Sequence, residues 1–261
     1  MMAYSRLSPI AISAHRNVSH AAHLQQLIES FTNQTTQTTQ LLRDTINYIN
    51  EAGDAYRSEL TQKFLPILVS SNTTNETGVT DRYAIILCNK LIDRSCCDEL
   101  ANVNGFIPYI QRAMTNRHIC IARPASSAMM KLIAHAPVPE RVMTHSEIDI
   151  VPLTRAATQN LSSNVDANQC LDAIRVLTIL NQESKLSPDN ELCDHMVETF
   201  YENRTPYVSK QTAGLILMLT KDDNDFKTAV SRLLRERAAE NKPIQAARCW
   251  QEVNDVMIMA A

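Results

Sequence analysis

The sequence Phe64-Leu65-Pro66-Ile67 recurs, in altered form, as Phe106-Ile107-Pro108-Tyr109 and as Ile150-Val151-Pro152-Leu153. Each copy consists of two large apolar residues, a proline and a third large apolar residue. The prolines are 42 and 44 residues apart (108 − 66 and 152 − 108). Self-similarity with a period of about 40–47 residues is typical of stacked helical repeats. The motif therefore predicts that this chain of 261 residues is built from repeated helical units.

A second series of residues has the same period. Four alanines open apolar runs at spacings of 44, 45 and 40 residues, and an apolar residue follows each of them four positions later. The alanines are Ala84, Ala128, Ala173 and Ala213, and the residues that follow are Cys88, Leu132, Leu177 and Leu217. We expect the alanine to let two helices approach closely and the next residue to fill the space beside it. Such helices bury their apolar faces only when the units stack on one another.

Prolines and caps predict where the helices begin. The first four backbone N–H groups of a helix have no partner within it, so we expect the motif prolines to lie in a first turn. Asn104 is expected to cap the helix that contains Pro108, and Pro124 to open the following helix. Asp81 and Asp166 are expected to cap two further helices. No useful stretch alternates between apolar and polar residues, so we predict no strands.

These signals divide the chain into four regions. We expect a flexible tail at residues 1–17, capping helices at 18–57, about four repeats at 58–222 and closing helices at 223–261. Solenoids need such atypical ends to cover their terminal faces. Helices are expected near 59–70, 81–93, 97–102, 105–115, from 124 onward, and near 149–158, 166–181, 191–202, 205–221, 225–240 and 243–259.

Composition excludes several classes of function. With only 4 glycines, the chain contains neither a dinucleotide-binding fingerprint nor a P-loop. A net charge of −3 gives no overall attraction to nucleic acid. The 7 cysteines are odd in number and scattered through apolar runs, which indicates buried thiols in a reducing compartment. No signal-peptide pattern and no apolar run long enough to cross a membrane occur, so we expect a cytoplasmic or nuclear protein.

The stretch Asn104–Met114 resembles the second helix of an armadillo repeat, in which a glycine, an aliphatic pair and a proline precede leucines. The stretches Ala84–Leu91 and Ala173–Leu180 resemble the third helix of that repeat. The resemblance covers roughly residues 60–240. It implies an all-α, right-handed armadillo-like solenoid, in which the third helices line a concave groove.

In the importin and catenin branches of that family, a ladder of Trp and Asn in the groove grips an extended peptide. The ladder is absent here: the corresponding positions are Ile86, Met130, Arg175 and Leu215 for Trp, and Lys90, Ala134, Ile179 and Leu219 for Asn. A receptor for nuclear-localisation signals is therefore not expected. Two interpretations of this mostly apolar row stay open: a partner helix lies on it, or it is no binding row, because the register is shifted by one residue or because tight curvature buries it within the protein. We take Ile86, Lys90, Met130, Arg175, Ile179 and Leu215 as the candidate partner-binding residues.

Residues capable of catalysis or metal binding do not form a recognisable set. His20 and His23 lie one helical turn apart without a neighbouring carboxylate or thiolate, which disfavours a metal site. Cys193 and His195 are interpreted as a core thiol beside a surface imidazole, and the pair Cys96-Cys97 matches no redox motif. The charged run between Arg232 and Lys242 is interpreted as a solvated, ion-paired helix face.

We therefore expect a non-catalytic scaffold or adaptor that binds one or more proteins. We expect no enzyme activity, no cofactor, no bound metal, no nucleic-acid partner and no membrane insertion. A regulatory subunit that modulates an enzyme, ATPase or chaperone partner is the first alternative. A helical-repeat enzyme or a nucleic-acid repair protein is the second, and it would need a convergent acid and base or a basic groove.

Overall fold

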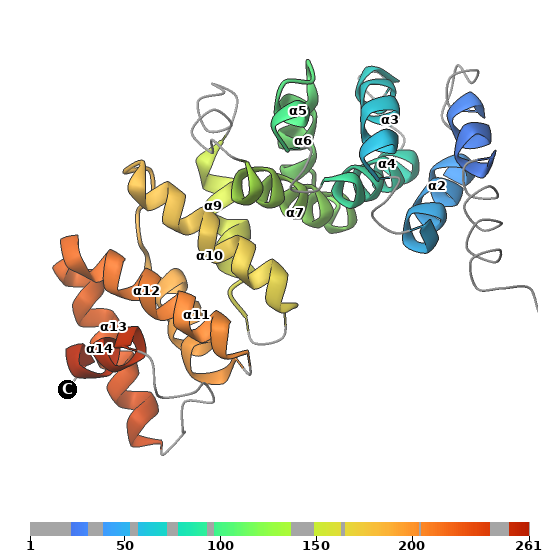
Figure 1. Cartoon of the computed structure of the whole chain (residues 1–261). Helices are drawn as coiled ribbons and strands as arrows, with labels where there is room; N and C mark the ends of the chain where they lie inside the picture. Colours follow the sequence, from blue (N-terminus) through green and yellow to red (C-terminus); the bar gives the residue numbers. More distant parts are fainter. Residues whose placement is uncertain are drawn as a thin grey trace, which may run out of the picture. The chain divides into compact units, whose positions relative to one another are not determined.

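The computed structural model describes residues 22–30, 39–52, 57–71, 78–92, 97–136, 149–162, 165–203, 205–240 and 251–260. Every regular element in these ranges is a helix, which confirms the all-α prediction (Figure 1). The predicted tail at 1–17, most of the Thr/Gln-rich run, residues 137–148 and Trp250 lie outside the described residues.

The chain folds as two compact units, Met1–Ala125 and Ser126–Ala261. The first contains a helix at 22–30, α2 (Thr39–Ala52), α3 (Arg57–Ser71), α4 (Gly78–Leu91), α5 (Cys97–Ala101), α6 (Phe106–Met114) and the start of α7 (Ile119–His135). The second contains the rest of α7, α9 (Ile150–Gln159), α10 (Ala167–Gln182), α11 (Asn190–Glu202), α12 (Pro206–Asp222), α13 (Asn224–Ala239) and α14 (Gln251–Ala260).

In the first unit, α4 packs against both α2 and α3, and α6 packs against α3 and α5. The apolar pairs of the first two motif copies form the centre of this packing, because Phe64, Leu65, Phe106 and Ile107 are all buried. A buried hydroxyl also joins two helices: Thr61 Oγ1 in α3 donates a hydrogen bond of 3.2 Å to the Leu91 carbonyl at the end of α4.

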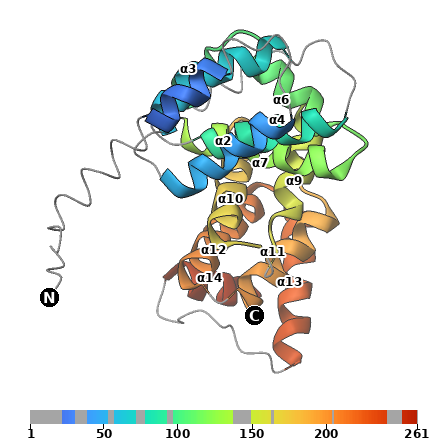
Figure 2. The same ribbon diagram turned by 90° about the vertical axis from the view of Figure 1, so that its right-hand side faces the viewer.

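In the second unit, alternate helices pack against each other. The helices α9, α11 and α13 form one series of neighbours, and α10, α12 and α14 form another (Figures 1 and 2). Helices adjacent in sequence also pack together, as α9 with α10, α11 with α12, and α13 with α14. The result is two layers of helices whose facing sides form the core.

The last helix of this unit is held by polar contacts as well as by packing. Lys210 Nζ in α12 lies 3.4 Å from Glu252 Oε1 in α14. The Tyr201 hydroxyl in α11 lies 3.8 Å from Met257 Sδ in α14, and it also donates to the Leu234 carbonyl in α13 at 3.3 Å. Burial raises the pKa of Tyr201, so this phenol stays protonated and able to donate.

Aspartates define the start of four helices in the second unit. The carboxylates of Asp149, Asp166, Asp189 and Asp223 accept backbone N–H bonds of 2.8–3.1 Å at the first turns of α9, α10, α11 and α13. Each bond satisfies one of the N–H groups that a helix leaves unpaired at its start. The predicted cap at Asp166 is thereby confirmed.

The periodic alanine series lies in the core, as its spacing predicts. Its four alanines and three of the residues that follow them are buried, whereas Leu217 is half-buried. The third copy of the proline motif differs from the other two, because Val151 remains 64% exposed and only Leu153 of that copy is fully buried.

The prolines mark helix starts only in part. Pro108 and Pro152 lie in the first turns of α6 and α9, as predicted. Pro66 instead lies inside α3, and Pro124 lies inside α7, which begins at Ile119. The prediction that Pro124 opens a helix is therefore wrong. A proline inside a helix removes one hydrogen bond, and the buried apolar side chains on both helices outweigh that loss.

Two predicted caps are also wrong. The residue before α6 is Gly105 rather than Asn104, and it makes no side-chain cap bond. Its φ of +79° is left-handed, a conformation that glycine adopts without the penalty of a Cβ atom. The helix α4 begins at Gly78, three residues before Asp81 (81 − 78), so Asp81 lies within the helix.

Two glycine substitutions should shift stability in opposite directions. Gly105→Ala should lower the free energy of unfolding by about 1–2 kcal/mol, because alanine is strained at positive φ. An added Cβ would meet Val69 Cγ1 only at an ordinary contact distance of 3.4 Å. Gly214→Ala, inside α12 with no atom within 4 Å of the added Cβ, should raise it by about 0.5–1 kcal/mol. Urea unfolding measures both, and equal effects would contradict this assignment of backbone conformation.

One buried amide in α6 is unsatisfied. Gln111 is 8% exposed, and neither its Nε2 nor its Oε1 has a hydrogen-bond partner in the structure of the described residues. A buried polar group without a partner loses its hydration and gains nothing in exchange.

Replacing this amide should therefore not weaken the fold. Gln111→Met keeps a similar shape and should leave the free energy of unfolding unchanged or raise it by about 1 kcal/mol. Gln111→Glu, which buries a charge, should lower it by more than about 1 kcal/mol. Urea unfolding of both variants tests this, and a loss of stability in Gln111→Met as large as in Gln111→Glu would show that the amide has a partner.

Candidate binding surfaces

The six residues predicted to bind a partner differ widely in exposure. Lys90 in α4 and Arg175 in α10 are exposed, and Ile86 is half-buried. Met130 in α7 and Leu215 in α12 are each 1% exposed, and Ile179 in α10 is 9% exposed. The apolar members of the row are thus largely or wholly covered by the protein itself.

This distribution favours one of the two interpretations of the row. A partner helix needs apolar side chains that are accessible in the free chain, and Met130 and Leu215 do not meet that condition. Their burial fits the interpretation that these positions pack inside the protein. What the row does offer at the surface is positive charge, at Lys90 and Arg175.

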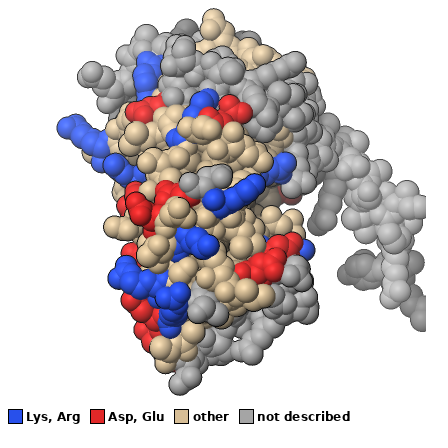
Figure 3. Space-filling view, turned by 90° about the vertical axis from the view of Figure 1, so that its left-hand side faces the viewer, with Lys and Arg blue, Asp and Glu red and all other residues tan. Residues whose placement is uncertain are grey.

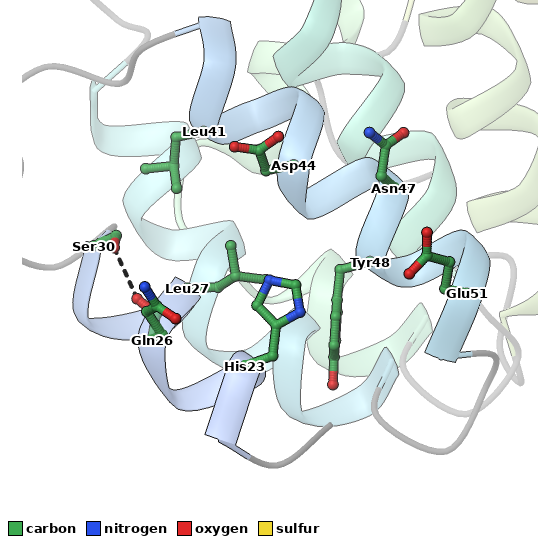
Figure 4. Close-up of a pocket in the computed structure, with 9 residues that line it drawn as sticks. All are labelled: His23, Gln26, Leu27, Ser30, Leu41, Asp44, Asn47, Tyr48 and Glu51. Carbon is green, nitrogen blue, oxygen red and sulfur yellow. Dashed lines mark hydrogen bonds between the residues drawn. The ribbon is translucent and has the colours of Figure 1, made fainter. Parts of the chain in front are cut away.

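A hollow that the sequence did not indicate lies between the 22–30 helix and α2 (Figure 4). Its volume is about 330 Å³. One side comes from the 22–30 helix and the other from α2, in each case from residues at helical spacing. The lining residues are His23, Gln26, Leu27, Ser30, Leu41, Asp44, Asn47, Tyr48 and Glu51.

The lining of this hollow is acidic and aromatic. It carries the carboxylates of Asp44 and Glu51 and no lysine or arginine. The His23 and Tyr48 rings meet edge to face, with centroids 5.0 Å apart. Asp44 already accepts a bond of 2.8 Å from Gln40 Nε2. The arrangement suits a small cationic or hydrogen-bonding group, because two carboxylates and an aromatic ring line it.

The hollow lies within residues 18–57, for which the sequence predicts only capping helices. A usable signal was present in the sequence: Asp44, Tyr48 and Glu51 share one side of a helix, at spacings of four and three residues. Of the earlier pair, His23 lines the hollow, and His20 lies outside the described residues.

The buried thiols have low reactivity. Burial raises the pKa of the Cys88 thiol to about 12 and that of Cys170 to about 12. Burial, helped by the charge of Asp194, raises the pKa of Cys193 to about 11. These thiols are protonated at neutral pH and are poor nucleophiles. The burial of these three and of Cys97 confirms the prediction of buried thiols, whereas Cys120 is exposed.

His195 differs from the prediction of a surface imidazole. It is half-buried, and its Nδ1 lies 3.1 Å from the Leu161 carbonyl. The ring therefore joins α11 to the segment after α9 instead of facing solvent. A second histidine, His135 in α7, lies with its Nε2 3.2 Å from Asp172 Oδ1 in α10.

The charged face of α13 is ion-paired, as predicted. Arg232 pairs with Glu236 at 3.8 Å, and Arg237 lies within 3.7 Å of both Glu202 and Glu240. Figure 3 shows one face of the molecule on which, among the described residues, basic and acidic side chains are interspersed. Neither sign covers that face, so it lacks the continuous basic stripe of a nucleic-acid interface.

No family model, curated protein or solved structure matches this chain. Among the described residues, no group of three or more His, Cys, Asp or Glu side chains is arranged to hold a metal ion. None of the helices in the described ranges is both long enough and apolar enough to span a bilayer.

Alkylation should separate the exposed thiol from the buried ones. With iodoacetamide at pH 8 and native conditions, Cys120 should react at least about a hundredfold faster than Cys88 and Cys170, because a pKa near 12 leaves almost no thiolate. Site-resolved mass spectrometry measures the rates. In urea the three rates should converge, and native rates of similar size would contradict the buried assignment.

Proposed function

We propose that this chain is a non-catalytic scaffold or adaptor that holds a partner protein on the surface of an armadillo-like stack of helices. One observation carries the proposal: from α9 to α12, each helix packs against the helix two positions further along the chain, which gives two series of neighbours. Repetition of this contact is how helical-repeat proteins build extended surfaces from units that contact only their neighbours. The period of the sequence motif supports the same reading.

The surface around α13 suits a protein partner better than nucleic acid. Arg232 and Arg237 on α13 are paired with acids, and the face in Figure 3 carries both signs of charge among the described residues. Within the repeat-like part of the chain, the exposed candidate contact in the second unit is Arg175 on α10, one turn before Ile179. Arginine is enriched at protein interfaces because its guanidinium group binds carboxylates in a fixed geometry and also packs on apolar surface.

A charge reversal at this position tests the proposal. Wild type, Arg175→Glu and the matched surface control Lys227→Glu, whose side chain is exposed on α13, would serve as baits in cross-linking capture from the source cells. We expect at least one protein to be recovered with wild type and Lys227→Glu but reduced about tenfold with Arg175→Glu, because reversing an interface charge creates repulsion.

The protein so identified would then be purified and its Kd measured for the three chains. Equal recovery by all three baits, or equal Kd values, would contradict a binding role for this surface. Circular dichroism and urea unfolding confirm that the variants are folded, since both substitutions are at exposed positions.

A further inference from the structure

The turn between α6 and α7 and the helix ends beside it carry several exposed basic side chains and an exposed isoleucine. Arg112 lies in the last turn of α6, Arg117 and His118 lie in the connecting turn, and Arg123 lies in α7. All four are exposed, and Ile119 at the start of α7 is 77% exposed. We call these five residues the α6–α7 edge; they belong to the first unit alone.

Helix geometry directs part of this edge away from the core. In α7, residues 119, 120 and 123 fall on one side, and that side is exposed. The opposite side carries Ile121 and Ala125, which are 2% and 0% exposed. Because Ile121 faces the core, Ile119 on the opposite side of α7 faces solvent.

The backbone of the turn is held in place. Asn116 Oδ1 accepts a bond of 2.9 Å from the His118 N–H, and the His118 carbonyl accepts bonds from the N–H groups of Ile121 and Ala122 at 2.9 and 3.0 Å. Thr115 Oγ1 donates to the Arg112 carbonyl at 3.0 Å. A partner would therefore meet a surface that is ordered beforehand, which lowers the entropic cost of binding.

Among the described residues, no acidic side chain pairs with this edge. No Asp or Glu occurs in the sequence between Glu99 and Glu140, and the first turn of α7 contains no acidic residue. Within the described part of the chain, none of the edge arginines forms an ion pair, in contrast to Arg232 and Arg237 on α13. A chain with a net charge of −3 thus concentrates free positive charge at one place.

We propose that the α6–α7 edge binds an acidic segment of the partner protein, and that this segment carries a large apolar side chain. This inference rests on the proposed scaffold function. The carboxylates would pair with Arg117 and Arg123, since guanidinium groups bind carboxylates through two hydrogen bonds. The apolar side chain would cover Ile119, which gives the interface an apolar centre and a polar rim. A nucleic acid uses the charge but gains little from Ile119, and so it is the less favoured occupant.

A model peptide tests the edge directly. The probe is a fluorescein-labelled peptide of glutamates around one central leucine, and its binding to the full chain is followed by fluorescence anisotropy at low salt. The double variant Arg117→Glu, Arg123→Glu should weaken binding at least about tenfold. The matched double control Lys221→Glu, Lys227→Glu, exposed on α12 and α13, should change the Kd less than about twofold.

The apolar part of the proposal has its own variant. Ile119→Ser should weaken binding of the leucine peptide about threefold. It should leave binding of a peptide with serine in place of leucine unchanged, because only the leucine peptide buries apolar surface on Ile119. Weak binding of the acidic peptide, equal effects of the two double variants, or tighter binding of a single-stranded oligonucleotide of equal charge would each overturn the proposal. Circular dichroism confirms folding of every variant.

Failure of this inference is distinguishable from failure of the scaffold proposal. The double variant Arg117→Glu, Arg123→Glu is the edge variant. If it still captures every protein that Arg175→Glu loses, and binds the peptide as well as wild type does, the edge assignment is wrong and the scaffold function stands. If the edge variant alone loses a partner, the edge is the docking surface and the Arg175 surface is not.

Discussion

No helix of the second unit can cover its own apolar surface, and this constraint determines the rest of the structure. The buried residues of α10 extend over most of its circumference, from Cys170 to Leu180. A helix of this kind is stable only when neighbours cover it on several sides, and α9 and α12 do so. The same holds for α12, which packs against α10, α11, α13 and α14. The two series of alternate helices follow from this need for mutual cover.

The helical class and most of the helix positions were predictable because they depend on local patterns. Apolar spacing locates the helices, and short polar side chains such as Asp166 fix their starts. Prolines gave a weaker signal, since Pro66 and Pro124 lie inside helices whose packing outweighs one lost hydrogen bond. Local patterns also did not predict that Gly105, and not Asn104, directly precedes α6. The left-handed φ of Gly105 depends on the direction from which the chain enters the helix.

Binding surfaces were harder to predict, because exposure is a tertiary property. Met130 and Ile119 are both apolar residues of one helix, yet the first is 1% exposed and the second 77%. Their sequence environments do not reveal which one faces solvent. The hollow beside Tyr48 likewise depends on how two helices splay apart, which helical spacing alone does not specify. The absence of acidic residues between Glu99 and Glu140 is visible in the sequence itself, although the sequence-based expectations include no basic surface there.

The buried cysteines have a consequence beyond their packing. Cys88 lies in the first unit, and Cys170 and Cys193 lie in the second, each in a different helix. If a thiol ionises only when its helix leaves the core, its rate of modification reports how often the core opens locally. The alkylation rates of these three thiols would therefore report whether the two units open together or independently. The cysteines needed for this measurement are already present in the sequence.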